Sequence, residues 1–331
     1  MKALVTGPTG FIGSHLVEVL AGGGWDVRAL VRGTSDTSLL DEQGIEKAVG
    51  DVRDADSFTE AAKGMDAVFH AAALVGEWGD PKDFYDINVK GMKNAIDAAD
   101  AAGVPRFVDV SSTSVHGYEG FDKDTEDLPY RKTGVLYSDT KMEAEKLVWA
   151  AHAEGRIQAT TVRPCMVWGP RDRAFMTKVI FSCRSGMFAY INGGDHIVGL
   201  AHVRNVCDII KRAAENEDAV GKAFIATDGC DTTVRQMTEK LCEEVGVKKP
   251  RMSIPYPVAK FIGSASEGFF RMIGAKKSPM MTRMGVAVMG NNLSFDISRA
   301  KKVLGYEPQY RFPQGLGTFL EWFKSTYNFR S

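Results

Sequence analysis

The sequence has few cysteines and no arrangement that would pair them. Five cysteines occur in 331 residues, and none forms a Cys-x-x-Cys motif. An odd number of widely separated cysteines disfavours a disulfide framework and a zinc site, so we expect reduced, mostly buried thiols and no bound metal. These cysteines are Cys165, Cys183, Cys207, Cys230 and Cys242.

Long apolar runs and an excess of one charge are also missing. No run approaches the ~18 apolar residues of a membrane span, and Ala3–Val5 is far shorter than the apolar core of a signal peptide. The formal net charge is -1 and the cationic residues are scattered, which argues against a basic surface for nucleic acid. We therefore expect a cytoplasmic protein without a transmembrane segment that does not bind nucleic acid.

The sequence does contain an alternation of strand and helix patterns. With 44% hydrophobic residues, the chain can bury a large core. Strands separated by helices of this length predict parallel β-α-β units in a doubly wound sheet, a Rossmann fold of the α/β class. The expected strands are 1–5, 25–31, one ending near 50–51, 67–70, 106–110 and 158–162, and the expected helices include 57–63, 84–102 and 138–153.

The alternation loosens after Pro164. Proline, glycine and methionine become frequent between 250 and 290, which indicates short elements in a smaller lobe. We predict a dinucleotide-binding domain over 1–165 and a mainly substrate-binding lobe over 166–331, with some segments of this lobe returning to the main sheet.

A glycine-rich turn, TGPTGFIG at 6–13, directly follows the first expected strand. Gly7 allows a sharp turn, Gly10 lets a pyrophosphate approach the backbone, and Gly13 lets the following helix pack close to the sheet. The N–H groups at that helix N-terminus then face the phosphates. Three glycines alone can form a structural turn, but their place between a strand and a helix predicts a nicotinamide dinucleotide.

The end of the second strand bears on which dinucleotide binds. An acidic residue there usually holds the 2′-hydroxyl of NAD, whereas this strand ends in Val31-Arg32-Gly33. Arg32 can form a fork of hydrogen bonds to a 2′-phosphate. We predict a preference for NADP(H), with NAD(H) as the alternative if Arg32 is only an exposed arginine. After the third strand, Asp51 either binds the adenine amino group, with Val52 on the ring, or caps the next helix.

Tyr137 and Lys141 are four residues apart, which places them on one face of a helix. A tyrosine with its ordinary pKa of about 10 is a poor base at neutral pH. A nearby ammonium, together with the positive nicotinamide ring, favours the phenolate and lowers that pKa, so the pair can move a proton to or from a substrate oxygen. Alone, such a spacing is usually a surface pair. It gains weight here from the glycine turn in the same chain.

The expected strand 106–110 runs into four hydroxyl residues, Ser111-Ser112-Thr113-Ser114. A hydroxyl at the carboxyl end of a strand lies where ligands bind in open α/β sheets, and it can orient a reacting oxygen. The other hydroxyls of the run are expected to bond locally to the backbone.

Taken together, these segments resemble the extended short-chain dehydrogenases/reductases, the NAD-dependent epimerase/dehydratase family. Within this family, the sequence most resembles the 3β-hydroxysteroid dehydrogenases and the dihydroflavonol 4-reductases. The resemblance covers essentially the whole chain. It is carried by the residues Thr6–Gly13, Gly50–Asp54, His70–Ala73, Asn88–Gly91, Ser111-Ser112, Tyr137, Lys141, Arg163-Pro164, His202–Val206 and Phe295–Pro308.

The resemblance implies a role for each matching residue. Ser112 would be the catalytic hydroxyl, Tyr137 the acid/base and Lys141 its partner. His116 stands where the family often has tyrosine, and we assign it no catalytic role. The expected cofactor-binding residues are Gly7, Thr9, Gly10, Phe11, Ile12, Gly13, Arg32, Asp51, Val52, Ala71, Ala72, Tyr137, Lys141, Pro164 and Cys165.

Two other reactions of the family compete with simple carbonyl reduction. Dehydratases carry an Asp-Glu pair just after the active-site hydroxyl, where this chain has Thr113 and Ser114, so dehydration is disfavoured. Nucleotide-sugar epimerases hold a diphosphate with basic residues of the second lobe. Arg171, Arg173 and Arg204 keep that alternative open, although the usual acid for bound NAD is missing.

We favour reversible ketone/alcohol chemistry on a small-molecule substrate that is bulky and apolar. We also expect the protein to form a homodimer. Segment 258–293 supports an apolar pocket, because methionine-rich linings adapt to irregular ligands. The same residues can instead pack the lobe's own core, form a dimer face or meet a membrane, for which Lys276 and Lys277 are a thin basic signal. A redox sensor or scaffold without turnover is the remaining alternative, and the complete Ser112, Tyr137 and Lys141 set argues against it.

Overall fold

The computed structural model describes residues 1–329 and confirms the α/β class with one large parallel sheet. The strand order is β11-β7-β5-β4-β1-β2-β3, so the chain builds one half of the sheet, returns to the centre and builds the other half. The strands are β1 (Lys2–Thr6), β2 (Asp26–Val31), β3 (Glu46–Val49), β4 (Ala67–His70), β5 (Arg106–Val110), β7 (Gln158–Pro164) and β11 (Ala223–Ala226). The order reverses between β1 and β4, and ligands of doubly wound sheets bind at such a point.

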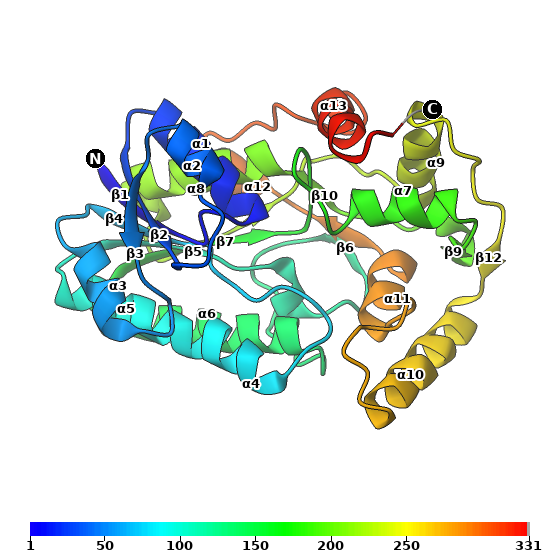
Figure 1. The fold of residues 1–331 in the computed structure, drawn as a ribbon, viewed down its shortest axis with the longest axis horizontal. Coiled ribbons are helices and arrows are strands. Elements are labelled where there is room, and N and C mark those ends of the chain that lie inside the picture. Colours follow the sequence, from blue (N-terminus) through cyan, green and yellow to red (C-terminus); the bar gives the residue numbers. More distant parts are fainter. Residues whose placement is uncertain (330–331) are drawn as a thin grey trace.

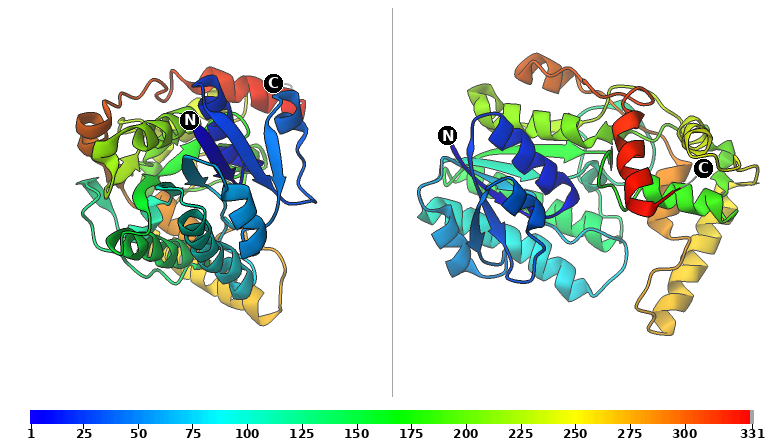
Figure 2. Two further views of the ribbon diagram at one scale, coloured as in Figure 1. Left: turned by 90° about the vertical axis from the view of Figure 1, so that its left-hand side faces the viewer. Right: turned by 45° about the horizontal axis from the view of Figure 1, so that its top comes forward.

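Helices cover both faces of this sheet (Figures 1 and 2). One face carries α1 (Phe11–Gly22), α8 (Val203–Glu215) and α12 (Ser298–Leu304). The opposite face carries α3 (Ala55–Ala62), α5 (Gly91–Ala101) and α6 (Leu136–Ala153). Each face buries its own apolar core, which explains why the strands read as nearly continuous apolar runs.

Two expected strands, 67–70 and 106–110, have the boundaries predicted for them. The helix predicted over 84–102 is divided into α4 (Pro81–Phe84), the π-helix η1 (Tyr85–Lys90) and α5. Within η1, the Asn88 side chain bonds both backbone groups of Leu74, at 2.7 and 3.1 Å. A side-chain bond of this kind has no signature in the apolar periodicity, so the sequence could not indicate the interruption.

The rest of the chain forms shorter elements. Three pairs of short parallel strands are β6 (Phe121–Asp124) with β13 (Leu293–Phe295), β8 (Met166–Trp168) with β10 (Leu200–His202), and β9 (Tyr190–Ile191) with β12 (Ser253–Ile254). The remaining helices are α2 (Ser38–Glu42), η2 (Thr113–His116), α7 (Met176–Arg184), η3 (Asn192–Gly194), η4 (Glu217–Ala219), α9 (Val234–Glu244), α10 (Tyr256–Met272), α11 (Arg283–Gly290) and α13 (Leu316–Tyr327). Strand β11 pairs with β7 in the main sheet, while the division at residue 165 stays a prediction.

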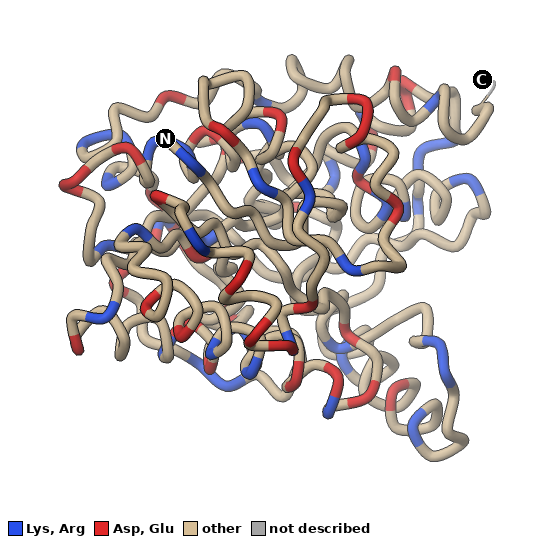
Figure 3. Tube along the Cα trace, turned by 60° about the vertical axis from the view of Figure 1, so that its left-hand side comes forward, with Lys and Arg blue, Asp and Glu red and all other residues tan. Residues whose placement is uncertain are grey.

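Helix α10 differs from the other helices because it projects from the body of the molecule (Figures 1 and 2). The apolar segment 258–293 therefore divides in two. Val286 and Val288 of α11 are buried, as a packed core predicts, whereas Phe261 and Met272 of α10 are exposed. Within residues 1–329, no helix is long and apolar enough to cross a membrane. Figure 3 shows positive and negative residues interspersed along the trace.

Candidate active site

The glycine turn packs directly on the chain that leaves β4. Gly7 has φ +65°, and a Cβ there would lie 2.9 Å from the Ala72 Cα, so both conformation and space require glycine. A Cβ on Gly13 would lie 2.0 Å from the Gly7 carbonyl oxygen, which is a direct clash. The Thr6 hydroxyl also accepts a hydrogen bond from the Ala72 N–H at 3.1 Å. The turn and Ala71-Ala72 therefore form one surface, as the resemblance implies.

The beginning of α1 fits a pyrophosphate. Gly10 is its N-cap residue, and in the described chain no side chain caps it and no acidic residue occupies its first turn. The backbone N–H groups of Phe11 and Ile12 are therefore available to an anion at the positive end of the helix. Thr9 lies exposed beside them.

The expected adenosine-binding end of the site contains a contact between charged side chains that the sequence did not indicate. Arg32 is exposed after β2, and its charge helps to lower the pKa of Asp51. The Asp51 carboxylate accepts two hydrogen bonds from the Arg53 guanidinium, at 2.7 and 3.0 Å, and these are the main cause of its lowered pKa. The alternative that Asp51 caps α3 is wrong, because the N-cap is Asp54, whose carboxylate accepts from the N–H groups of Asp56 and Ser57.

Ser112, Tyr137 and Lys141 come together at the carboxyl end of β5. Ser112 is the N-cap of η2, and its hydroxyl accepts from the Ser114 N–H at 3.1 Å. Its neighbour Ser111 turns away and donates to the Glu145 carboxylate at 2.5 Å. This difference identifies Ser112 as the hydroxyl that faces Tyr137.

The expected lowering of the Tyr137 pKa is not what the chain alone produces. Burial raises the pKa of Tyr137 to about 12, and the hydrogen bond with Ser112 only partly opposes this effect. The Asp109 carboxylate contributes to the same increase in the Tyr137 pKa. Because desolvation outweighs the favourable contacts, Tyr137 is a phenol at neutral pH and is ready to donate a proton.

Lys141 is held by two groups of β5. Its ammonium lies 3.4 Å from the Asp109 Oδ1 and donates to the Val110 carbonyl oxygen at 2.9 Å, and both charged side chains are buried. Burial raises the pKa of Asp109 to about 6, while the Lys141 charge acts in the opposite direction. Sequence reasoning missed Asp109, because an aspartate inside an apolar strand belongs to no motif.

Three further hydrogen bonds fix the start of α6. The Asp139 carboxylate accepts from the Thr133 N–H at 2.7 Å and from the Gly134 N–H at 3.0 Å, which anchors the preceding loop. From η1, the Asn88 amide donates to the Thr140 hydroxyl at 2.9 Å. Thr140 lies between Tyr137 and Lys141 in the helix, so Asn88 links the loop after β4 to the catalytic pair.

A buried ion pair between Arg163 and Glu145 connects elements around the site. The Arg163 guanidinium binds the Glu145 carboxylate at 2.5 Å and also contacts the His116 ring at 3.1 Å. His116 is buried and stacks on Tyr130, so its role is structural, in keeping with the absence of a catalytic assignment. This network joins β7 to α6 and η2, the two helices at which the expected catalytic residues lie.

On the side of the second lobe, Pro164 ends β7 and Cys165 follows it at the same edge of the sheet. Burial raises the pKa of Cys165 to about 11, so it remains a thiol. Arg171 binds Glu18 of α1 at 2.6 Å, and Arg204 lies 3.9 Å from the same carboxylate, whereas Arg173 is exposed.

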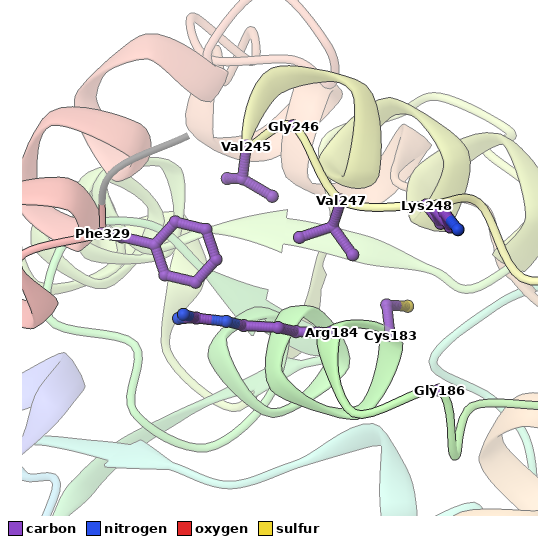
Figure 4. A pocket seen from close by; sticks show the side chains of 8 residues that line it. All are labelled: Cys183, Arg184, Gly186, Val245, Gly246, Val247, Lys248 and Phe329. Atoms are coloured by element: carbon purple, nitrogen blue, oxygen red, sulfur yellow. The ribbon is translucent and has the colours of Figure 1, made fainter.

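A cavity of about 320 Å³ opens elsewhere, between α7, the end of α9 and the end of the described chain (Figure 4). None of its lining residues is an expected site residue. They are Cys183, Arg184, Gly186, Val245, Gly246, Val247, Lys248 and Phe329. We therefore do not assign the substrate to this cavity. Among residues 1–329 there is also no cluster of three or more His, Cys, Asp or Glu side chains that could hold a metal ion.

Known proteins share this fold over the full chain. The structure titled "Crystal structure of gox2253" superposes with a TM-score of 0.84 at 30% identity, covering 99% of both chains. MoeE5, solved in complex with UDP-glucose and NAD, superposes with a TM-score of 0.77 at 25% identity, covering 99% of this chain and 100% of that one.

Two curated relatives are reductases or dehydrogenases by name. A 4-hydroxy-2-methyl-3-oxo-4-farnesyl-3,4-dihydroquinoline-1-oxide ketoreductase of Stigmatella aurantiaca is 30% identical, covering 96% of this chain and 95% of its own. A 3 beta-hydroxysteroid dehydrogenase/Delta 5-->4-isomerase of Mycobacterium tuberculosis (strain ATCC 25618 / H37Rv) is 28% identical, covering 98% of this chain and 91% of its own.

The family assignment agrees with the glycine turn, the parallel sheet and the Ser112, Tyr137 and Lys141 arrangement. Residues 3–226, more than half of the chain, match one family over β1 to β11. The chain belongs to the NAD dependent epimerase/dehydratase family.

Proposed function

We propose that the protein is an NADP(H)-dependent dehydrogenase/reductase that interconverts a ketone and a secondary alcohol on a bulky apolar substrate. The observation that carries the proposal is the convergence of Ser112, Tyr137 and Lys141 at the carboxyl end of β5. The names of the relatives from Stigmatella aurantiaca and Mycobacterium tuberculosis support the same type of reaction.

The chain's own residues handle the substrate oxygen and its proton. In the reductive direction the Tyr137 phenol donates a proton to that oxygen, and the Ser112 hydroxyl donates a hydrogen bond that stabilises the developing negative charge. The buried Lys141 ammonium supplies a fixed positive charge at the carboxyl end of β5, where Asp109 and Val110 orient it. A nicotinamide held by the glycine turn would supply or accept the hydride.

For the cofactor, the proposal rests on the residues at its two ends. Gly7, Gly10 and Gly13 would hold the pyrophosphate, and Arg32 would bind a 2′-phosphate. The contact between Asp51 and Arg53 is compatible with a phosphorylated ribose, because it partly neutralises the carboxylate close to Arg32. NAD(H) is the alternative cofactor.

The runner-up, a nucleotide-sugar epimerase using bound NAD, is supported by the fold of MoeE5 and by the arginines of the second lobe. Two of those arginines already share the Glu18 carboxylate, which reduces the positive charge that they can offer to a diphosphate. This contact favours the reductase. We further propose that the enzyme is a cytoplasmic homodimer.

A spectrophotometric screen at the absorbance band of reduced nicotinamide tests the proposal. The purified protein is offered sterols, flavanonols, simple ketones and nucleotide sugars, each with NADPH and with NADH. We expect net oxidation of NADPH by an apolar ketone. Epimerisation of a nucleotide sugar without net absorbance change would establish the runner-up, and no turnover of any compound would favour a sensor or scaffold.

A further inference from the structure

Helix α10 touches the rest of the protein along a very narrow stripe. Of its residues only Ala259, Gly263 and Glu267 are buried, and they follow one another at one-turn intervals. Gly263 lies against the backbone of Thr282, where a Cβ would be 3.2 Å from the carbonyl carbon. A helix that rests on small residues in this way keeps most of its circumference free of protein contacts.

Large apolar side chains occupy the free side of α10 and its end. Phe261 is 73% exposed and Met272 is 77% exposed. The others in this group are Val258, Ile262, Phe269 and Ile273. Their spacing follows the helical period, so they form one continuous face on an element that projects from the body (Figure 1). Such a concentration of exposed apolar side chains marks an interaction surface.

The charge around this face has one sign. Between Tyr256 and Thr282 the only acidic residue is Glu267, which is buried and bonded to Arg283 at 2.8 Å. The exposed charged residues of the same stretch are Lys260, Arg271, Lys276 and Lys277. A net charge of -1 for the whole chain makes this local excess of positive charge distinct.

We infer that α10 and the turn after it, residues 258–280, bind an anionic lipid surface. The apolar face would lie among the acyl chains near the interface, while Lys276 and Lys277 of the turn reach the phosphate groups. A second copy of the chain fits this surface poorly. A symmetric contact through α10 would bring the same positive side chains together, and the segment offers no exposed acid to pair them.

The surface contacts the loop that follows the expected cofactor surface at Ala71 and Ala72. The Trp78 indole N–H donates to the Ala275 carbonyl oxygen at 2.9 Å, and the Arg271 guanidinium lies 5.3 Å from the centre of the Trp78 ring. Glu77 contacts the Thr282 hydroxyl. Both residues belong to the loop between β4 and α4, which also contains Ala71 and Ala72 of the expected cofactor surface. A membrane-dissolved substrate would therefore arrive beside the site.

Vesicle flotation of the full chain tests the inference without requiring turnover. We expect binding to vesicles of phosphatidylcholine with phosphatidylglycerol, much weaker binding to phosphatidylcholine alone, and release by salt. The variant Phe261→Gln/Phe269→Gln/Met272→Gln should lose on the order of a hundredfold in affinity. Lys276→Gln/Lys277→Gln should lose roughly 30-fold.

Two variants outside the segment serve as controls. Met187→Gln removes another exposed apolar side chain, and Lys302→Gln removes another exposed cation. Both should bind as the wild type does, and thermal unfolding checks that every variant folds. Equal binding to both vesicle types, or unchanged binding of the triple variant, overturns the inference. So does sedimentation showing that the wild type is a dimer that the triple variant converts to a monomer, because a second copy then covers α10.

Discussion

The carboxyl edge of the sheet and helix α10 differ in which side chains they bury and which they expose. At the edge of the sheet, ionised and polar groups such as Lys141 and Asp109 are buried and contact one another. On α10, large apolar groups such as Phe261 face solvent. Buried polar groups without partners cost about 1–3 kcal/mol each, and exposed apolar area costs about 25 cal/mol per Å². Lys141 finds its partners within the chain, although the Asp109 Oδ2 is buried without one. The apolar side chains of α10 have no partner within the described chain, and by our inference a lipid surface covers them.

The largest expected loss of activity at the carboxyl edge of the sheet comes from Tyr137→Phe. This change removes the proton donor and leaves the ring, so kcat should fall by about 10²–10⁴, while the Kd for NADPH stays nearly the same. Tyr85→Phe on the exposed surface of η1 is the matched control and should leave kcat unchanged. Full turnover by the Tyr137 variant would remove Tyr137 from the mechanism.

Asp109→Asn tests how the buried charges act on each other. The pKa of Asp109 is raised from 3.8 to about 6, so its protonated form is favoured in the folded state. Its contribution to stability is therefore greatest below pH 3.8 and is lost as the pH rises through about 6. The variant has no carboxylate at this position, so it does not lose this contribution as the pH rises. Relative to the wild type, its free energy of unfolding should therefore increase by on the order of 3 kcal/mol between pH 4 and pH 8.

The same variant has a second readout in activity. The Asp109 carboxylate raises the pKa of Tyr137, so its removal should shift the Tyr137 limb of the pH–rate profile to lower pH. Parallel stability curves together with an unshifted pH–rate profile would show that Asp109 is not charged beside Tyr137 in the working enzyme. Asp97→Asn, at a partly exposed ion pair, is the control for general effects of charge removal.

Arg32→Ala tests the adenosine end of the same surface. A hydrogen bond to a charged group contributes about 1.5–3 kcal/mol, so the Kd for NADPH should rise roughly 10- to 100-fold. The Kd for NADH should change little, because NADH has no 2′-phosphate. Cofactor titration by fluorescence measures both constants. Equal affinities for the two cofactors in the wild type, unchanged in the variant, would contradict the NADP(H) preference.

The smallest expected effects come from two glycines of α1. Gly13→Ala should cost about 1–3 kcal/mol of stability, because its Cβ would clash with the Gly7 carbonyl oxygen, and it should weaken cofactor binding. Gly22→Ala, which has nothing within 4 Å of its Cβ, should add about 0.5–1 kcal/mol. Denaturant unfolding compares them. Equal effects at both positions would mean that close packing of the turn is not the reason for Gly13.

The sequence could predict the edge of the sheet because its features are local. Strand periodicity gave β4 and β5, and the spacing of Tyr137 and Lys141 placed both on α6. Asp109 and the contacts of Asn88 could not be predicted in this way, since their partners lie on other elements far along the chain. The projection of α10 also has no sequence signature. Its apolar residues suit a core as well as a surface, and only the tertiary packing on Ala259, Gly263 and Glu267 distinguishes the two.

Transfer of deuterium from the nicotinamide ring tests the central claim most directly. NADPH carrying deuterium at the transferring C4 position is incubated with the protein and its preferred ketone, and the product is analysed by mass spectrometry and NMR. The account predicts one deuterium on the carbinol carbon of each alcohol formed, with an equal amount of NADP⁺. An alcohol without the label, or a substrate inverted at carbon with no net NADP⁺, would contradict it.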